Sequence, residues 1–158
     1  MSGPLKRDPR LVALSHDHHQ VLARCREVTL ALDGVQPRDP AELAAEMVAF
    51  SNGELDSHFE AEEQILVPPY LAHAGRNRLV ETLEAQHAHI RELGARLAGA
   101  GEDAVADCLS AWAEAVKAHI RFEERELFGA VQEALSEEEL EAVGRGLAAR
   151  GSGPACAL

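Results

Sequence analysis

The chain has 158 residues, of which 46% are hydrophobic and 27% charged, so it suits one folded domain rather than a disordered segment. A formal net charge of −12 argues against nucleic-acid and anionic-membrane partners, because phosphate binding needs clustered lysine and arginine. No stretch reaches the roughly 18 apolar residues of a membrane-spanning helix, and Met1–Arg10 lacks the apolar centre of a secretion signal. The widely spaced Cys25, Cys108 and Cys156 indicate reduced thiols, so we expect a cytoplasmic protein.

The composition favours an all-α fold. Only 4% of the residues are aromatic, and the apolar residues are mostly alanine, leucine and valine, without short β-branched runs. The first expected helix covers about Pro9 to Leu32, with Leu14, Val21 and Leu22 on its apolar stripe, and ends at Asp33-Gly34.

Three further long helices and one shorter helix follow. The second opens with Asp39 as N-cap and is expected to stop at Pro68-Pro69. The third covers about residues 77 to 98, and the fourth about residues 102 to 128 or beyond. A capping box over Ser136–Glu139 begins the fifth, which ends near Gly151.

Long helices joined by short loops pack as antiparallel neighbours. We therefore expect one domain over residues 1–158, folded as an up-down-up-down four-helix bundle with a short extra C-terminal helix. The bundle core would cover about 9–135 and the extra helix about 136–150, and Ser152–Leu158 would form a frayed tail.

The most informative feature is a repeated His-x-x-x-Glu motif. The second helix carries His58 and Glu62, and the fourth carries His119 and Glu123. Residues four apart share one helix face, so each pair presents an imidazole and a carboxylate to the same point. Both pairs extend an apolar stripe and are expected to face the core, where an unpaired charge is costly.

The first and third helices each add a histidine in register with their stripes, His18 and His87, whereas His16, His19 and His89 lie off these lines. Distances along the helices, at 1.5 Å per residue, place His18, His58 and His87 at nearly one level. His119 fits less well, since it lies roughly 9 Å too far from the start of a helix that begins at Glu102.

This set of side chains predicts a metal centre. Imidazole with carboxylate suits iron, zinc, copper or manganese rather than calcium or magnesium, and six groups exceed the needs of one tetrahedral zinc. They fit two metals bridged by carboxylates. A lone core histidine is more often a hydrogen-bonded packing residue, but four at matching depths argue against a metal-free core. Glu60, Glu63 and Glu124 are expected to be solvated or to lie just outside the ligands, and Glu63 and Glu124 are candidates to accept hydrogen bonds from the outer nitrogens of ligating histidines.

The sequence resembles the hemerythrin-like family with its HHE cation-binding domain. The resemblance covers about residues 10 to 135 and rests on four segments: Leu14–His19, His58–Glu63, Gln86–Ile90 and His119–Glu124, the last followed by Leu127-Phe128. It implies two iron ions, with manganese or zinc as alternatives, and an oxygen-binding function. The implied ligands are His18, His58, Glu62, His87, His119 and Glu123, with His16 as the alternative ligand from the first helix.

Two departures bear on function. Oxygen-carrying members have a second histidine four residues after the position of His87, where this chain has Arg91, and an aspartate five residues after the position of His119. The resemblance therefore favours a non-enzymatic protein that binds or senses O2 or another diatomic such as NO.

The alternatives are an enzyme of nitric-oxide handling, iron-centre repair or oxidation, and a zinc-binding or metal-free structural bundle. Repair proteins of this type carry an N-terminal cysteine segment, and no cysteine precedes the first helix here. The oligomeric state is left open.

Overall fold

The computed structural model describes residues 6–151, and every regular element within that range is a helix. The predicted all-α class is confirmed. The predicted frayed tail and Cys156 lie outside the described residues. Cys25 is buried and Cys108 half-buried, and both are free thiols.

The first helical run begins close to its predicted position. A short 3-10 turn, η1 (Pro9–Leu11), leads into α1 (Val12–Leu32), and the side chain of Asp8 accepts a hydrogen bond from the backbone N–H of Arg10. Gly34 then adopts a φ of 77°, which only glycine adopts without strain, and this lets the chain turn away from α1.

The second run is longer than predicted. Its α-helical parts alternate with π-helical turns, in the order α2 (Pro40–Phe50), η2 (Ser51–Leu55), α3 (Asp56–Ala61), η3 (Glu62–Leu66) and α4 (Val67–Ala74). The prediction that Pro68-Pro69 ends this helix was wrong. The π-helical turn η3 interrupts the α-helical pattern just before the prolines, so they fall in the first turn of α4, where proline is tolerated.

The remaining helices follow their predictions closely. The side chain of Asn77 caps α5 (Arg78–Ala98). The next run consists of α6 (Val105–Phe122), the π-helical turn η4 (Glu123–Leu127) and α7 (Phe128–Ala134). The predicted capping box is present before α8 (Glu137–Gly151): the Glu139 N–H donates to Ser136 Oγ (3.2 Å), and the Ser136 N–H donates to Glu139 Oε1 (3.0 Å).

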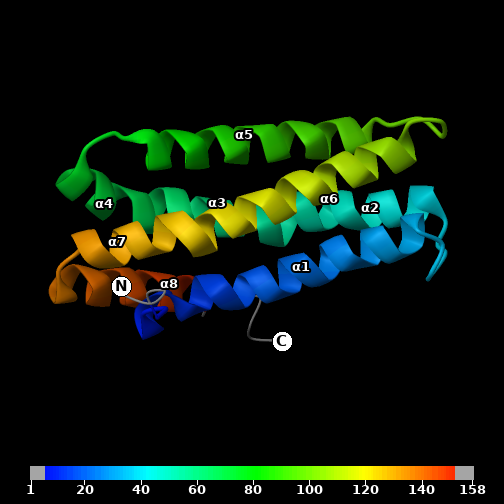
Figure 1. The fold of residues 1–158 in the computed structure, drawn as a ribbon. Coiled ribbons are helices and arrows are strands. Elements are labelled where there is room, and N and C mark those ends of the chain that lie inside the picture. The colour runs from blue at the N-terminus through cyan, green and yellow to red at the C-terminus, as the bar shows by residue number, and fades with distance from the viewer. Residues whose placement is uncertain (1–5, 152–158) are drawn as a thin grey trace.

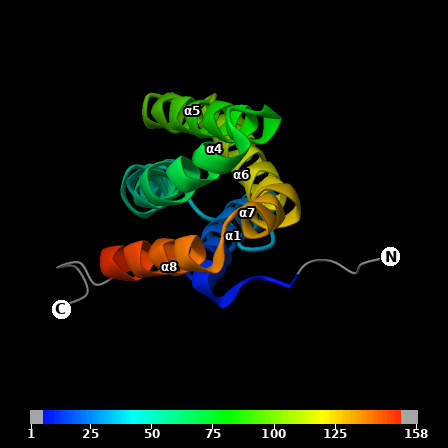
Figure 2. The same ribbon diagram turned by 90° about the vertical axis from the view of Figure 1, so that its left-hand side faces the viewer.

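The long runs lie side by side and reverse direction from one to the next (Figure 1). The helix α6 packs against both α1 and α5, and α2 packs against α5. The last helix, α8, lies at one end beside η1 (Figure 2), where Arg10 forms an ion pair with Glu137 (2.8 Å). Each long helix therefore has neighbours that cover its apolar stripe.

The core is divided into two apolar halves by a layer of buried polar side chains. One half contains Val21, Leu55, Ile90 and Val116, and the other contains Leu14, Leu66, Leu83 and Leu127. On each of the four runs, the polar residues of the predicted motifs fall between these two sets. The layer is thus built by all four runs at one level.

The stripe on α1 is narrower than predicted. The buried residues of this helix follow a strict spacing of three and four, namely Leu14, His18, Val21, Cys25 and Val28. Leu22 is 40% exposed, so its predicted place on the stripe was wrong. It lies at the outer edge, because a strict three-and-four spacing forms a stripe only two positions wide.

Candidate metal centre

Each glutamate of the two His-x-x-x-Glu motifs is the first residue of a π-helical turn. Glu62 begins η3 and Glu123 begins η4. The motif spacing brings His58 Nε2 to 2.5 Å from Glu62 Oε1, and His119 Nε2 to 2.8 Å from Glu123 Oε1. Single π-helical turns within α-helices are frequent at functional sites.

The π-helical turns were missed from the sequence, although a signal exists. The two turns have the sequences EEQIL and EEREL, so both follow the pattern Glu-Glu-x-x-Leu after the motif histidine. The repeated pattern continues the similarity of the two motifs beyond His-x-x-x-Glu. It indicates that the same local geometry is used twice.

The structure brings all six predicted residues together, and all six are buried. Their nitrogen and oxygen atoms form two groups with ligand spacing: His18, His58, Glu62 and Glu123 in the first, and Glu62, His87 and His119 in the second. Glu62 belongs to both groups, with Oε1 toward His58 and Oε2 3.0 Å from His87 Nε2. The carboxylate of Glu62 therefore connects the two groups.

The first helix contributes His18 rather than His16 to this cluster. His18 Nε2 lies 3.2 Å from His58 Nε2 and 3.3 Å from Glu123 Oε1. His16 is exposed, and its ring meets only that of His19, edge to face, at 6.4 Å between centroids. His19 and His89 are exposed as well, as their positions off the stripes predicted.

The apparent depth mismatch of His119 is about halved in the structure. The helix α6 begins at Val105 rather than Glu102, which removes about 4.5 Å of the difference. The rings of His87 and His119 meet edge to face, with centroids 4.9 Å apart. The two histidines therefore lie at one level.

The outer nitrogen of every clustered histidine has a polar partner. His18 Nδ1 lies 2.8 Å from Glu124 Oε1, and His87 Nδ1 lies 2.7 Å from Glu63 Oε1, as predicted. Two further partners were missed: Asp17 Oδ2 lies 2.9 Å from His58 Nδ1, and Gln86 Oε1 lies 2.6 Å from His119 Nδ1. Such contacts fix the ring orientation of a metal-ligating histidine, so that Nε2 faces the metal.

Asp17 and Gln86 share a feature that was visible in the sequence. Each directly precedes a clustered histidine, His18 or His87, and reaches the histidine of a neighbouring helix. Glu63 and Glu124 likewise directly follow the clustered glutamates. Every outer partner is thus the sequence neighbour of a residue in the cluster.

Arginines anchor two of these outer carboxylates. Arg91 donates from Nη1 to Glu63 (2.9 Å) and from Nε to Asp56 (2.8 Å), and Arg7 donates from Nη2 to Glu124 (2.9 Å). Arg91 occupies the position at which the resemblance led us to look for another histidine. Its guanidinium holds an outer partner of the cluster instead.

Aromatic rings close the cluster on two sides. The ring of Phe59 stacks on His87 with centroids 4.0 Å apart, and the ring of Phe128 stacks on His18 at 5.6 Å. Both phenylalanines are almost completely buried. They keep water away from the imidazoles and limit their rotation.

In the metal-free protein, neighbouring histidines and glutamates shift one another's pKa values toward the charged forms. Burial by itself lowers the pKa of His18, but the carboxylates of Glu123 and Glu124 outweigh burial and raise it to about 9. Burial opposes the charged form of His58 and His87 too, yet neighbouring carboxylates, chiefly Glu62, raise the pKa of each. Burial raises the pKa of Glu124, but hydrogen bonds, first from His18, lower it to about 2.

These values predict how the metal-free protein responds to pH. A histidine has a pKa near 6.5 when unfolded. The stability that His18 contributes is therefore present below pH 6.5 and lost as the pH rises through about 9. Glu124 contributes stability above about pH 4.5 that is lost as the pH falls toward about 2.

We expect chelator-treated protein to be most stable between about pH 4.5 and pH 6.5. It should lose roughly 2–3 kcal/mol of unfolding free energy by about pH 10. Urea denaturation across this range measures the change. Metal-loaded protein is the control. Its histidines are already deprotonated, so its alkaline loss should be much smaller. Equal losses in both samples would contradict the assignment of the alkaline loss to the cluster.

Several buried polar atoms in the cluster have no hydrogen bond. Among the described residues they include Glu62 Oε1, His119 Nε2 and both carboxylate oxygens of Glu123; the close approach of Glu62 Oε1 to His58 and of Glu123 Oε1 to His119 lacks hydrogen-bond geometry. Buried polar atoms without partners are rare and cost free energy. Metal coordination would satisfy each of them, since imidazole nitrogen and carboxylate oxygen are both ligands of first-row transition metals. The residues present therefore fit a metal centre.

Comparison with known families agrees with this geometry. A family model described as the hemerythrin HHE cation binding domain matches residues 11–131. The chain belongs to this family. The matched range contains every residue of the cluster and both π-helical turns that follow the motifs. The earlier resemblance is confirmed, and family and cluster together indicate a metal-binding protein.

The other comparisons add no relative. No curated protein and no solved structure matches the chain significantly. None of the helices in residues 6–151 combines the length and the apolar character needed to cross a membrane.

Proposed function

We propose that this protein binds two iron ions in the polar layer and uses the centre to bind or sense a small diatomic molecule, O2 first and NO as an alternative. The proposed ligands are the six clustered residues, namely His18, His58, Glu62, His87, His119 and Glu123. We further propose that residues 1–158 form one cytoplasmic four-helix-bundle domain to which α8 is an addition.

The observation that carries the proposal is the position of Glu62 between two groups of ligand atoms. Its two carboxylate oxygens face different histidines, and it is fully buried. Glu123 belongs to the first group, and its Oε1 lies 3.3 Å from His18 Nε2 and 2.8 Å from His119 Nε2, a nitrogen of the second group. Two carboxylates between two pairs of histidines suit two metal ions better than one.

The surroundings suit a small neutral ligand. The phenyl rings of Phe59 and Phe128 and the apolar core halves exclude bulk water from the cluster. Arg91 supplies no ligand atom, so one protein ligand fewer is available than in oxygen carriers with another histidine at that place. Iron, when bound, would supply the open coordination position and the electrons for diatomic binding. The chain itself holds the histidine rings in place and keeps the centre dry.

The test combines metal analysis with a spectrum. Protein purified without chelator should contain about two iron ions per chain, and the anaerobic ferrous form should gain visible absorption bands when O2 or NO is admitted. Zinc-loaded protein is the matched control, because zinc has no redox chemistry. An iron-loaded sample whose spectrum does not respond to either gas would reject the diatomic function. Zinc alone in the purified protein would favour a structural centre.

A further inference from the structure

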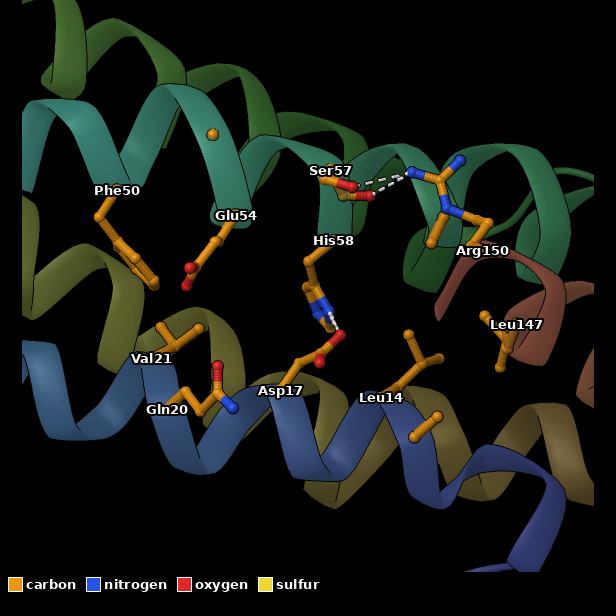
Figure 3. Close-up of a pocket in the computed structure, with 13 residues that line it drawn as sticks. Leu14, Asp17, Gln20, Val21, Phe50, Glu54, Ser57, His58, Leu147 and Arg150 are labelled. Carbon is orange, nitrogen blue, oxygen red and sulfur yellow. Dashed lines mark hydrogen bonds and ion pairs between the residues drawn. The ribbon is translucent and has the colours of Figure 1, made fainter. Parts of the chain in front are cut away.

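A pocket of about 500 Å³ reaches the cluster from the protein surface. It opens between α1 and the run from α2 to α3, and α8 borders one end of it (Figure 3). Apolar side chains line much of its wall, among them Leu14, Val21 and Phe50, with Leu147 from α8. Of the six clustered residues, His58 alone lines this pocket.

His58 enters the pocket wall together with its outer partner. Figure 3 shows the His58 ring extending from α3 toward Asp17 on α1, and the two side chains are joined by their hydrogen bond. The side chain of Asp17 is 52% exposed, although the His58 side chain is only 3% exposed. One clustered histidine therefore lines this pocket beside its own, more exposed hydrogen-bonding partner.

His58 is also held less firmly on its outer side than His18 or His87. Glu124, behind His18, is anchored by Arg7 and by the hydroxyl of Ser15. Glu63, behind His87, is anchored by Arg91. Within residues 6–151, the carboxylate of Asp17 bonds to His58 and to no other side chain. The outer partner of His58 is thus freer to move with the ring than the partners of His18 and His87.

The polar residues of the pocket favour a cation. Asp17 and Glu54 both line it. Arg150, which also lines the pocket, lies on the opposite side of His58 from Glu54 (Figure 3), where its Nη2 donates to Ser57 O (2.8 Å) and Ser57 Oγ (3.1 Å) and lies 3.8 Å from Glu60. The part of the pocket between His58, Asp17 and Glu54 is therefore acidic.

We propose that this pocket is the route by which a hydrated divalent transition-metal ion reaches and leaves the group of His18, His58, Glu62 and Glu123. The His58 ring is the ligand that rotates toward the pocket. Asp17 is the positioning residue whose hydrogen bond brings the ring back to its place in the cluster. The inference rests on the proposed metal centre. It adds that the two metal positions exchange at different rates, since the group of His87 and His119 does not line the pocket.

Gly53 allows the route to be blocked. It lines the pocket, and a Cβ built on it meets nothing within 4 Å, so a larger side chain has room. Gly53→Phe should slow the faster phase of Fe²⁺ release to an excess of chelator about tenfold, with both ions still bound. Asp17→Asn should speed the same phase about tenfold, because loss of an outer partner weakens a metal-ligating histidine by about that factor. Gln20→Trp fills the same pocket from α1. It tests the route independently if Gly53→Phe fails to fold.

Ala45→Phe is the matched control, because Ala45 lies on the same helical run but lines a different pocket. It should leave both release phases unchanged. Wild-type protein that retains no iron would overturn the metal centre and the route together. Two retained ions whose release is the same in wild type, Gly53→Phe and Gln20→Trp would overturn the route alone. Equal acceleration of both phases by Asp17→Asn would also contradict it.

Discussion

The variant Glu62→Gln is expected to lose both metal ions, with the iron content falling from about two per chain to nearly none. Glu62 is the residue common to both groups of ligand atoms, and its two oxygens face His58 and His87. Glutamine keeps the size of the side chain but removes its negative charge and one acceptor oxygen. Each metal position then loses an anionic ligand, so the affinity of both should fall together. Elemental analysis after purification without chelator measures the result.

The control for this variant is Glu60→Gln. Glu60 lies on the same run two residues earlier but is exposed, and its nearest cation is Arg150 at 3.8 Å. Its replacement should leave the iron content unchanged. A Glu62→Gln protein that keeps two ions would reject the shared-carboxylate arrangement. Loss of one ion alone would show that Glu62 serves a single metal.

The second large effect is expected from Phe59→Ala. The Phe59 ring is 1% exposed, stacks on His87 and meets His119 edge to face at 5.3 Å. Arg91 lies over its ring at 5.5 Å. Truncation of such a buried ring costs about 3–5 kcal/mol of unfolding free energy, which urea denaturation of the chelator-treated protein would show. The same change leaves a void beside both histidines, so the metal held by His87 and His119 should be released faster.

Leu109→Ala is the control that separates the two effects of Phe59→Ala, the loss of stability and the faster release of metal. Leu109 is fully buried, but it lies ten residues before His119 on α6, about 15 Å along the helix. Its truncation should cost about 2–5 kcal/mol without changing metal release. If Leu109→Ala and Phe59→Ala released metal equally fast, general loosening of the core would explain the result, and a specific role of the Phe59 ring would be rejected.

Much of the candidate site was predictable because its geometry is local. The spacing of four between His58 and Glu62, and between His119 and Glu123, fixes which face of one helix carries both side chains. The same periodicity separated His18 from the exposed His16, and the usual hydrogen bonding of ligating histidines pointed to Glu63 and Glu124 as outer partners. These predictions required only helical geometry and the cost of burying polar groups.

Other features depended on contacts between helices. Asp17 and Gln86 were missed because the rings they hold belong to neighbouring helices, and which helices are neighbours is not a property of one helix. The continuation past Pro68 depended on a π-helical turn that shifts the backbone hydrogen bonds before the prolines.

By itself, the sequence determined that the chain is helical and that six residues on four helices form one buried polar layer, because helix periodicity and burial act along each segment. Only the tertiary structure decided that Glu62 belongs to both groups of ligand atoms and that an acidic pocket reaches His58 alone among the clustered residues. Both features arise from atoms on different helices. Their distances depend on how the helices pack, which periodicity along one helix does not specify.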